Sequence, residues 1–236
     1  MARQSPARTR FFAERKATHM NTTASQAIER LPVNEEFAQP AGPEAVERAA
    51  EALRAHNFDA YIVEDGDAAR DLVMSLIPEG AEVGQGASRT LEQIGVTTAI
   101  EQSGCYEAVR PRLRAMDRAT QMREIRKAGA APDFQVNSVQ AVTEDGRMLV
   151  VSFGGSQLGP IVSGAGRVIL VAGAQKVVPD LATAFRRVEE YSLPIEDVNL
   201  QQAYGRRSAA NKTVILAGEV APGRTTVILV RRPVGN

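Results

Sequence analysis

The alternation of apolar and polar residues predicts short strands and helices in turn from residue 43 onward. Apolar residues at helical spacing begin at Pro43, whose fixed φ suits the first turn of a helix. Strand-length apolar runs follow, separated by turn residues. The predicted helices are 43–55, 68–76 and 179–191, and the predicted strands are 58–63, 81–83, 136–142, 147–153, 167–172, 213–216 and 225–230. Such alternation is typical of an α/β sandwich with a largely parallel sheet.

The N-terminal region has a different pattern. Residues 1–42 show no sustained periodicity and contain Pro32, Pro40 and Gly42. We therefore expect a flexible N-terminal extension with at most one short helix, and a single domain over residues 43–236. The longest apolar runs have the length of strands, well below the roughly 20 residues that span a bilayer. We expect no membrane association and a cytoplasmic protein.

The amino-acid composition limits the kinds of functional site that this chain can form. The 236 residues carry 28 basic and 28 acidic side chains, so no net charge draws the chain to nucleic acid or to an anionic membrane. One cysteine and two histidines exclude an intrachain disulfide and a Cys-rich metal site, so no metal is expected. Catalysis would therefore rest on carboxylates, hydroxyls, backbone amides or a bound cofactor that the sequence does not identify.

A first glycine loop follows the predicted strand 81–83. Gly84 and Gly86 allow the backbone to approach a ligand closely, and Ser88 or Thr90 would cap a helix whose free amides face an anion. Arg89 lies between these two hydroxyl residues. The segment has neither the third glycine of a dinucleotide fingerprint nor the Lys-Ser/Thr of a phosphate loop. An ordinary strand-to-helix turn with a serine cap explains the same pattern.

Glu144 is the candidate catalytic residue. It lies in Thr143-Glu144-Asp145-Gly146, between two predicted strands, where a carboxylate at a strand end would serve as nucleophile or general base. The alternative is a plain hairpin turn, for which Asp-Gly is a strong signal.

A second glycine loop follows the strand 147–153. Gly154, Gly155, Ser156 and Gln157 would offer a second set of backbone amides opposite the first loop. A flexible connection is the alternative interpretation.

Three further features have structural explanations. The segment 110–127 carries seven basic and two acidic residues but no aromatic residues for base stacking, which favours a solvated helix face. Cys105 is interpreted as a half-buried structural thiol. His56 is interpreted as the C-terminal cap of the first helix.

Several ordered motifs together resemble the LUD domain family, the LutC/YkgG-type lactate-utilisation proteins. The resemblance covers roughly residues 43–236. It rests on the segments GQGASRTLEQIGV, NSVQAVTEDGRMLVV, GRVILVAGAQKVVPDLATAFRRV and PGRTTVILVRRPVG. The TEDG turn and the VVPDL helix start are its most specific parts.

The resemblance implies a three-layer α/β/α fold similar to the NagB/RpiA/CoA-transferase-like superfamily, whose members bind sugar phosphates or CoA between glycine loops. It implies a role in lactate or organic-acid utilisation, with a small anionic or nucleotide-like ligand between the two loops near Glu144. Two alternatives remain: a non-catalytic assembly partner of an iron–sulfur oxidoreductase, and an acyl or CoA transferase that uses Glu144 as nucleophile.

The chain departs from the family pattern in two places. Similar proteins of the compact type have an Asp-Gly-x-Gly-Asn-Arg loop, where this chain has Phe153, Gln157 and Leu158 in place of the Asp, Asn and Arg. Many also have a Cys-rich insert, where this chain has a cysteine-free segment at 204–210. The resemblance therefore supports a ligand-binding domain better than a self-sufficient redox enzyme, and leaves Arg89 as the guanidinium available to an anion.

Overall fold

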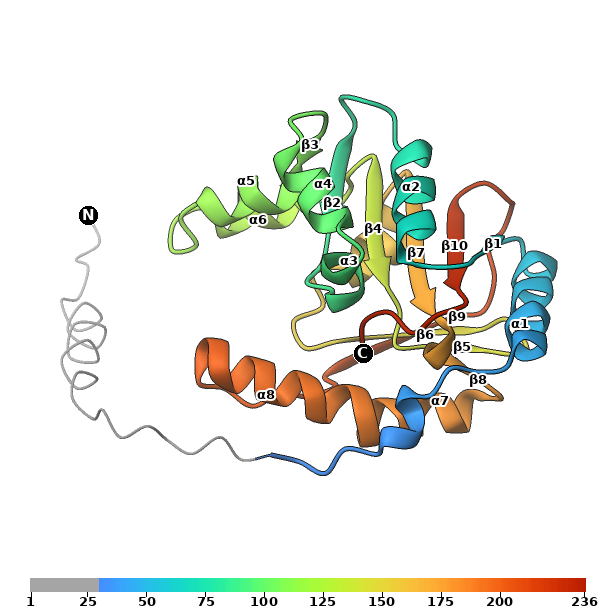
Figure 1. Ribbon diagram of the computed structural model, residues 1–236. Coiled ribbons are helices and arrows are strands. Elements are labelled where there is room, and N and C mark those ends of the chain that lie inside the picture. Colours follow the sequence, from blue (N-terminus) through green and yellow to red (C-terminus); the bar gives the residue numbers. More distant parts are fainter. Residues whose placement is uncertain (1–29) are drawn as a thin grey trace, which may run out of the picture.

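A six-stranded parallel sheet forms the centre of the protein (Figure 1). The computed structural model describes residues 30–236. Every neighbouring pair of strands in this sheet runs parallel. Their spatial order is β1 (Asp59–Val63), β10 (Thr225–Val230), β7 (Arg167–Gly173), β4 (Phe134–Ser138), β2 (Glu82–Gln85) and β3 (Glu107–Ala108).

Both faces of the parallel sheet are covered, which explains its continuous apolar strands. Along β7, Val168 and Leu170 contribute to one hydrophobic core, while Ile169 and Val171 contribute to the other. Successive side chains of a strand point to opposite faces, so a strand such as β7, apolar at successive positions, fills both cores.

Three helices cover the first face: α2 (Gly66–Leu76), α3 (Arg89–Gln93) and α4 (Val96–Gln102). The predicted serine cap of α3 is confirmed, and α2 begins with an aspartate cap of the same kind. The Asp65 side chain accepts a hydrogen bond from the Ala68 amide, and the Ser88 hydroxyl accepts one from the Leu91 amide. Each cap satisfies an amide that the first helical turn leaves free.

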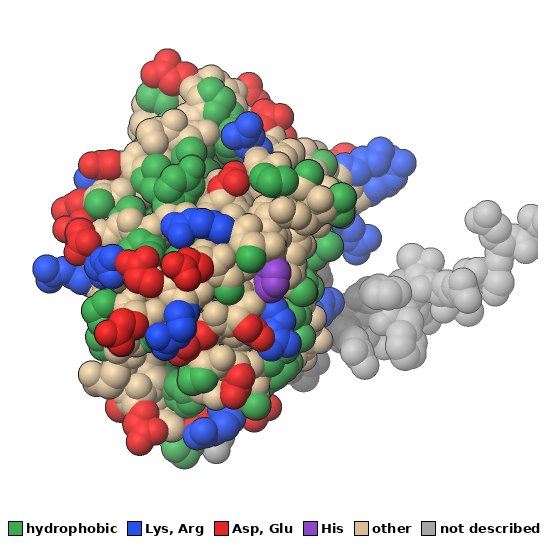
Figure 2. Space-filling view, turned by 90° about the vertical axis from the view of Figure 1, so that its right-hand side faces the viewer, with side chains coloured by type: hydrophobic (Ala, Val, Ile, Leu, Met, Phe, Trp, Pro, Cys, Tyr) green, Lys and Arg blue, Asp and Glu red, His purple; other side chains and the backbone are tan. Residues whose placement is uncertain are grey.

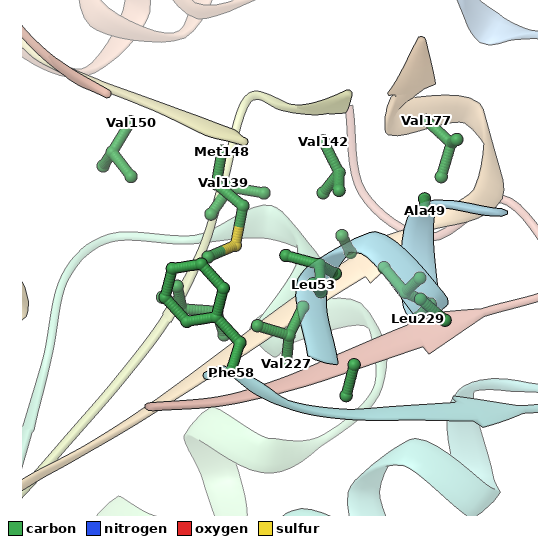
Figure 3. Packing of buried hydrophobic residues seen from close by; sticks show 14 of the residues in the cluster. Ala49, Leu53, Phe58, Val139, Val142, Met148, Val150, Val177, Val227 and Leu229 are labelled. Atoms are coloured by element: carbon green, nitrogen blue, oxygen red, sulfur yellow. The ribbon is translucent and has the colours of Figure 1, made fainter. Parts of the chain in front are cut away.

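The second face is covered by α1 (Pro43–Ala55) together with a smaller sheet (Figure 3). Leu53 of α1 and the following Phe58 lie between Val142 and Met148 of the smaller sheet and Val227 of β10. The order of the smaller sheet is β8 (Val177–Val178), β5 (Ala141–Thr143), β6 (Met148–Ser152) and β9 (Lys212–Leu216). The predicted three-layer α/β sandwich is therefore confirmed, with a sheet contributing to one outer layer.

A long helical region lies beyond the smaller sheet. It comprises α7 (Leu181–Arg187), a π-helical turn (Val188–Ser192) and α8 (Leu193–Tyr204). The pattern predicted a helix ending at Tyr191, and that end is wrong. Pro194 falls in the first turn of α8, where the missing amide hydrogen costs nothing, so the chain continues as helix.

The predicted strand 136–142 is in fact two strands in two different sheets. β4 ends at Ser138 and β5 begins at Ala141, after a two-residue connection. β5 then pairs with β6 in an antiparallel hairpin, as the TEDG turn predicted, with the Gly146 amide donating to the Thr143 carbonyl at 2.9 Å. Apolar residues continue through the connection because Val139 is buried in the core beside α1.

Two short helices project from the body beyond α4 (Figure 1). These are α5 (Val109–Ala115) and α6 (Met122–Ala128), which lie in the basic segment. His56 is the C-cap of α1, as predicted. Cys105 is exposed, so its interpretation as a half-buried thiol was wrong; it lies in a loop after α4 that no element covers.

Part of the predicted extension lies within the described residues. It forms a 3-10 turn (Glu35–Ala38), and the Asn34 and Ala41 amides donate to the carbonyls of Glu190 and Ala174. The remainder, residues 1–29, lies outside the described residues, so the extension stays a prediction. Over residues 30–236, no helix is both long and apolar enough to cross a membrane.

Replacing Gly146 by alanine should destabilise the protein by about 2 kcal/mol or more. Gly146 has a φ of +82°, and an added Cβ would lie 2.6 Å from the Ala52 carbonyl carbon, in the backbone of α1. Urea unfolding would measure the loss. Gly80→Ala is the matched control, since Gly80 has a φ of +79° with nothing within 4 Å. Equal losses in the two variants would show that the contact with α1 contributes nothing.

Candidate functional site

Several buried or half-buried polar residues lie at the carboxyl edge of the parallel sheet. Parallel α/β sheets bind ligands at this edge because the loops that leave neighbouring strands meet there. Here the loop after β2 carries Gly86 and Thr90, β4 ends with Asn137 and Ser138, and the 3-10 turn after β7 (Ala174–Lys176) carries Lys176. We call Thr90, Asn137, Ser138 and Lys176 the edge cluster.

Lys176 is the central member of the edge cluster. Its side chain is 3% exposed, and its Nζ lies 2.9 Å from both Thr90 Oγ1 and Ser138 Oγ. The two hydroxyl oxygens are 3.2 Å apart, so the three groups form a closed triangle. Thr90 is buried, whereas Ser138 is only half-buried.

Burial, together with the smaller effect of the positive charge of Arg187, lowers the pKa of Lys176 from 10.5 to about 7. Burying an ammonium group in an apolar interior disfavours its charged form unless an opposite charge compensates. Among residues 30–236 its hydrogen-bond partners are the two hydroxyls, and no carboxylate contributes to its pKa. A lysine in this environment changes its protonation state near neutral pH.

Arg187 of α7 fixes the backbone on both sides of the edge cluster. Its guanidinium donates to the Gln175 carbonyl at 3.0 Å and to the Gln140 carbonyl at 2.6 Å, and its side chain is fully buried. Gln175 precedes Lys176, and Gln140 lies two residues after Ser138. Arg187 therefore holds together the two segments that bring the amine and the serine hydroxyl into contact.

The backbone of the first glycine loop packs directly against the edge cluster. A Cβ on Gly86 would lie 2.7 Å from Asn137 Nδ2 and 3.4 Å from Gln157 Cβ, and the Gly86 amide donates to Asn137 Oδ1 at 3.4 Å. A Cβ on Gly84 would collide with Gln135 at 2.3 Å. Neither position has room for a side chain.

The rest of the first loop has defined contacts. Ser88 caps α3, and Thr90 belongs to the triangle with Lys176. Arg89 points away from the sheet toward α8, where its guanidinium donates to Asn199 at 3.4 Å. The loop therefore provides a helix cap, a member of the edge cluster and one guanidinium facing outward.

Gln157 of the second glycine loop packs against Gly86 of the first glycine loop. Its Oε1 accepts a hydrogen bond from Ser152 at 3.0 Å, and its Cβ faces Gly86. Gly155 has a φ of +88° and lies against Lys212, while Gly154 has open space around it and Ser156 is exposed. The structure thus brings Gly86, Asn137 and Gln157 together and leaves Gly154 and Ser156 toward solvent.

Glu144 lies at the other end of the smaller sheet's hairpin, against α1. Its carboxylate accepts a hydrogen bond from Arg48 of α1 at 2.8 Å, and its amide donates to the Val178 carbonyl. The surrounding face carries acidic and basic side chains in alternation (Figure 2). Among the described contacts, none joins Glu144 to either glycine loop, so its role as the catalytic carboxylate stays a prediction.

The C-terminal segment covers one side of the edge cluster. The Val234 carbonyl accepts hydrogen bonds from Gln175 Nε2 at 2.9 Å and from Thr90 at 3.4 Å. The Gly235 amide donates to Gln93 Oε1 at 2.7 Å. Thr90 is thus covered by backbone that the chain contributes after its last strand.

A pocket of about 460 Å³ lies beside this closure. Arg89 and Gln93 of α3 line one side, and Pro194 and Asn199 of α8 line another. Arg30, Gly235 and the C-terminal Asn236 also line the pocket, together with apolar residues of both sides. Two guanidinium groups therefore face one pocket next to Thr90.

Sequence reasoning missed Lys176, Ser138, Asn137 and Gln85. Gln85 is 8% exposed; its Nε2 donates to Glu101, while its Oε1 is buried without a partner. All four are polar residues inside or just after otherwise apolar strand sequences. That position, at the end of a buried strand, was the available signal. Among residues 30–236, no group of three His, Cys, Asp or Glu side chains is placed to hold a metal ion.

Replacing Lys176 by methionine should change how stability depends on pH. The folded protein binds the proton of Lys176 less tightly than the unfolded chain, because its pKa falls from 10.5 to about 7. The wild type should therefore gain stability relative to the variant as pH rises from about 7 toward 10, with a slope approaching roughly 1.4 kcal/mol per pH unit. Urea unfolding of both proteins across this range measures the difference. A difference that stays constant with pH would contradict the buried, shifted amine.

Comparison with solved structures finds a DUF162 family protein from Deinococcus radiodurans, determined at 1.70 Å resolution. It is 11% identical to this chain, with a TM-score of 0.48 over 81% of this chain and 99% of that one. No curated protein matches the chain.

A family model describes most of the domain. The model of the LUD domain matches residues 46–230, which include both glycine loops, the TEDG turn and every member of the edge cluster. On this match, the chain belongs to the LUD domain family.

Proposed function

We propose that this protein binds a small organic anion at the carboxyl edge of the parallel sheet and serves in lactate or related organic-acid utilisation. The observation that carries the proposal is Lys176, a buried amine whose partners in the structure are the hydroxyls of Thr90 and Ser138. A cation-capable group that lacks a carboxylate partner is stabilised in its charged form by an anion nearby.

The packing of the two glycine loops supports a ligand at this edge. Gly86 brings the first loop directly against Asn137 and Gln157, so both loops meet the polar end of β4. Gln85 Oε1 is buried without a partner close by. Polar groups of this kind orient a ligand in a site whose other walls are apolar.

The neighbouring pocket supports a ligand larger than the anionic group itself. Arg89 and Arg30 face it from the rim, and guanidinium groups bind carboxylates and phosphates through paired hydrogen bonds. A nucleotide-like or phosphorylated extension of the ligand would fit this chemistry.

A thermal-shift screen of lactate, pyruvate, sugar phosphates and CoA esters tests the proposal. We expect at least one anion to raise Tm by several degrees, and to do so more strongly at pH 6 than at pH 8.5, because the protonated form of Lys176 (pKa about 7) attracts the anion. Lys176→Met should abolish the shift.

Two further variants make this screen decisive. Lys127→Met removes an exposed charge from α6 and should leave the shift unchanged. Glu144→Gln tests the predicted catalytic carboxylate: a lost shift would extend the site to the hairpin turn, and a retained shift would confine it to the edge cluster. Stabilisation by none of the anions, or equal stabilisation of wild type and Lys176→Met, would contradict the proposed site.

A second candidate function is docking to an acidic partner, for which we propose an iron–sulfur oxidoreductase. The observation that favours it is the projecting pair α5 and α6 (Figure 1). Arg110 and Arg112 at its base pair with Glu101 and Glu82. Among the described ion pairs, none includes the five basic residues farther along, all exposed: Arg114, Arg118, Arg123, Arg126 and Lys127.

Reversing charge on α6 should weaken such docking. The double variant Arg123→Glu/Arg126→Glu should reduce binding to a purified iron–sulfur oxidoreductase subunit, and added salt should weaken wild-type binding, since exposed charges are screened. Surface plasmon resonance at low and high ionic strength measures both effects. Arg54→Glu, on α1, is the matched control. Binding that changes neither with salt nor with the α6 charges would contradict this docking proposal and would indicate a solvated helix face.

A further inference from the structure

The edge cluster places a half-buried hydroxyl in front of a buried amine. Ser138 is the half-buried member of the cluster, and Lys176 Nζ lies 2.9 Å from its Oγ. Thr90 Oγ1 contacts the same amine at 2.9 Å, beside Ser138 Oγ, and Thr90 is 1% exposed. A nucleophile in contact with a base, and a third group that orients the base, is the arrangement that activates a serine.

We propose that Ser138 and Lys176 form a nucleophile–base pair for acyl transfer, acting on an ester, thioester or amide of a small carboxylic acid. Thr90 is a positioning residue that holds the amine toward Ser138. The inference rests on the proposed function, because the carboxylic acid released by the reaction is the organic anion that the edge would bind.

The reaction balances with water as the sole co-reactant. The lone pair of the neutral Lys176 amine takes the Ser138 proton while Oγ bonds to the acyl carbon. The bond to the leaving group breaks, and Lys176 passes the proton to that group. Water then attacks the acyl-serine and loses a proton to Lys176, the bond between the acyl carbon and Oγ breaks, and Lys176 returns the proton to Ser138 Oγ as the carboxylic acid leaves.

The surroundings of Lys176 suit a base. A lysine can accept a proton at neutral pH only when its pKa is lowered, and burial lowers this one to about 7. The groups that face it from each element are Ser138 of β4, Thr90 of α3 and Arg187 of α7. Of these only Arg187 is charged, and its charge favours the neutral amine.

The positions of the other polar groups fit this assignment. Ser138 is the last residue of β4, so its side chain stands where the loop after β2 turns away from the sheet. Arg187 holds the backbone at Gln140 and at Gln175, which fixes the approach of Ser138 to Lys176.

Covalent labelling of the full-length protein tests the proposal. A fluorophosphonate probe should attach to Ser138, with loss of fluoride, and peptide mapping by mass spectrometry locates the adduct. The labelling rate should rise with pH through about 7, because the neutral amine is the base. p-Nitrophenyl acetate should be hydrolysed with the same pH dependence.

Variants separate the three roles. Ser138→Ala should lose the adduct, and Lys176→Met should slow labelling by about 100-fold or more. Thr90→Val should slow it and move the pH midpoint, while Thr90→Ser should restore both. Ser75→Ala, on the exposed side of α2, should label as the wild type does.

The outcomes distinguish this inference from the proposed function. An adduct elsewhere, no adduct, or a rate independent of pH between 6 and 8.5 would overturn the acyl-transfer assignment. The peptide mapping uses the wild-type protein, so it tests the acyl-transfer proposal even if a variant fails to fold. If an anion stabilises the protein but Ser138 is not labelled, the anion-binding proposal holds and the acyl-transfer proposal fails. If Ser138 is labelled but no anion stabilises the protein, the acyl-transfer proposal holds and the anion-binding proposal fails.

Discussion

The burial of one amine at the end of a parallel sheet constrains much of this structure. Lys176 is enclosed because the turn after β7 runs beneath α3 and the C-terminal segment, and neither supplies a carboxylate. A charged amine would be costly there, so the local structure provides two hydroxyls and lowers the pKa to about 7. Thr90 belongs to α3, which follows β2, and Ser138 is the last residue of β4. Their contact with Lys176 therefore joins the ends of β2, β4 and β7, which is where parallel sheets place their ligands.

The second buried cation explains how that arrangement is held. Arg187 satisfies the carbonyls at Gln175 and Gln140 and stacks over Tyr191 at 5.1 Å. Burial lowers the pKa of Arg187 to about 10, which leaves it charged at neutral pH. Its charge in turn favours the neutral form of Lys176. The protein thus keeps one cation as a permanent structural clamp and leaves the other able to gain or lose a proton.

Local signals in the sequence predicted the turns, caps and layers. The Asp-Gly of the hairpin, the Ser88 cap and the continuous apolar strands each follow from short-range backbone or packing requirements. The boundary between β4 and β5 was missed because Val139 is buried in the connection as deeply as it would be in a strand. The helix end at Tyr191 was missed because a π-helical turn carries the helix on into α8.

The candidate site was only partly predictable for a related reason. Glycines between a strand and a helix stand out in a sequence, so Gly84 and Gly86 were identified, and both pack directly against neighbouring side chains. Lys176 did not, since nothing local shows that a lysine after an apolar strand is enclosed by α3 and the C-terminal segment. Glu144 stood out as a carboxylate in a turn, yet the fold pairs it with Arg48 of α1. Which polar residues meet is decided by contacts between segments far apart in the chain.

The most direct measurement is the pKa of the Lys176 side chain in the folded protein. An NMR titration of ¹³Cε-labelled lysine, with the Lys176 signal assigned by its absence from Lys176→Met, reports it residue by residue. This account predicts a midpoint near 7, well below the ordinary lysine value of 10.5. A Lys176 midpoint in the ordinary lysine range would contradict it, because the amine would then be neither a base at neutral pH nor sensitive to an anion bound beside it.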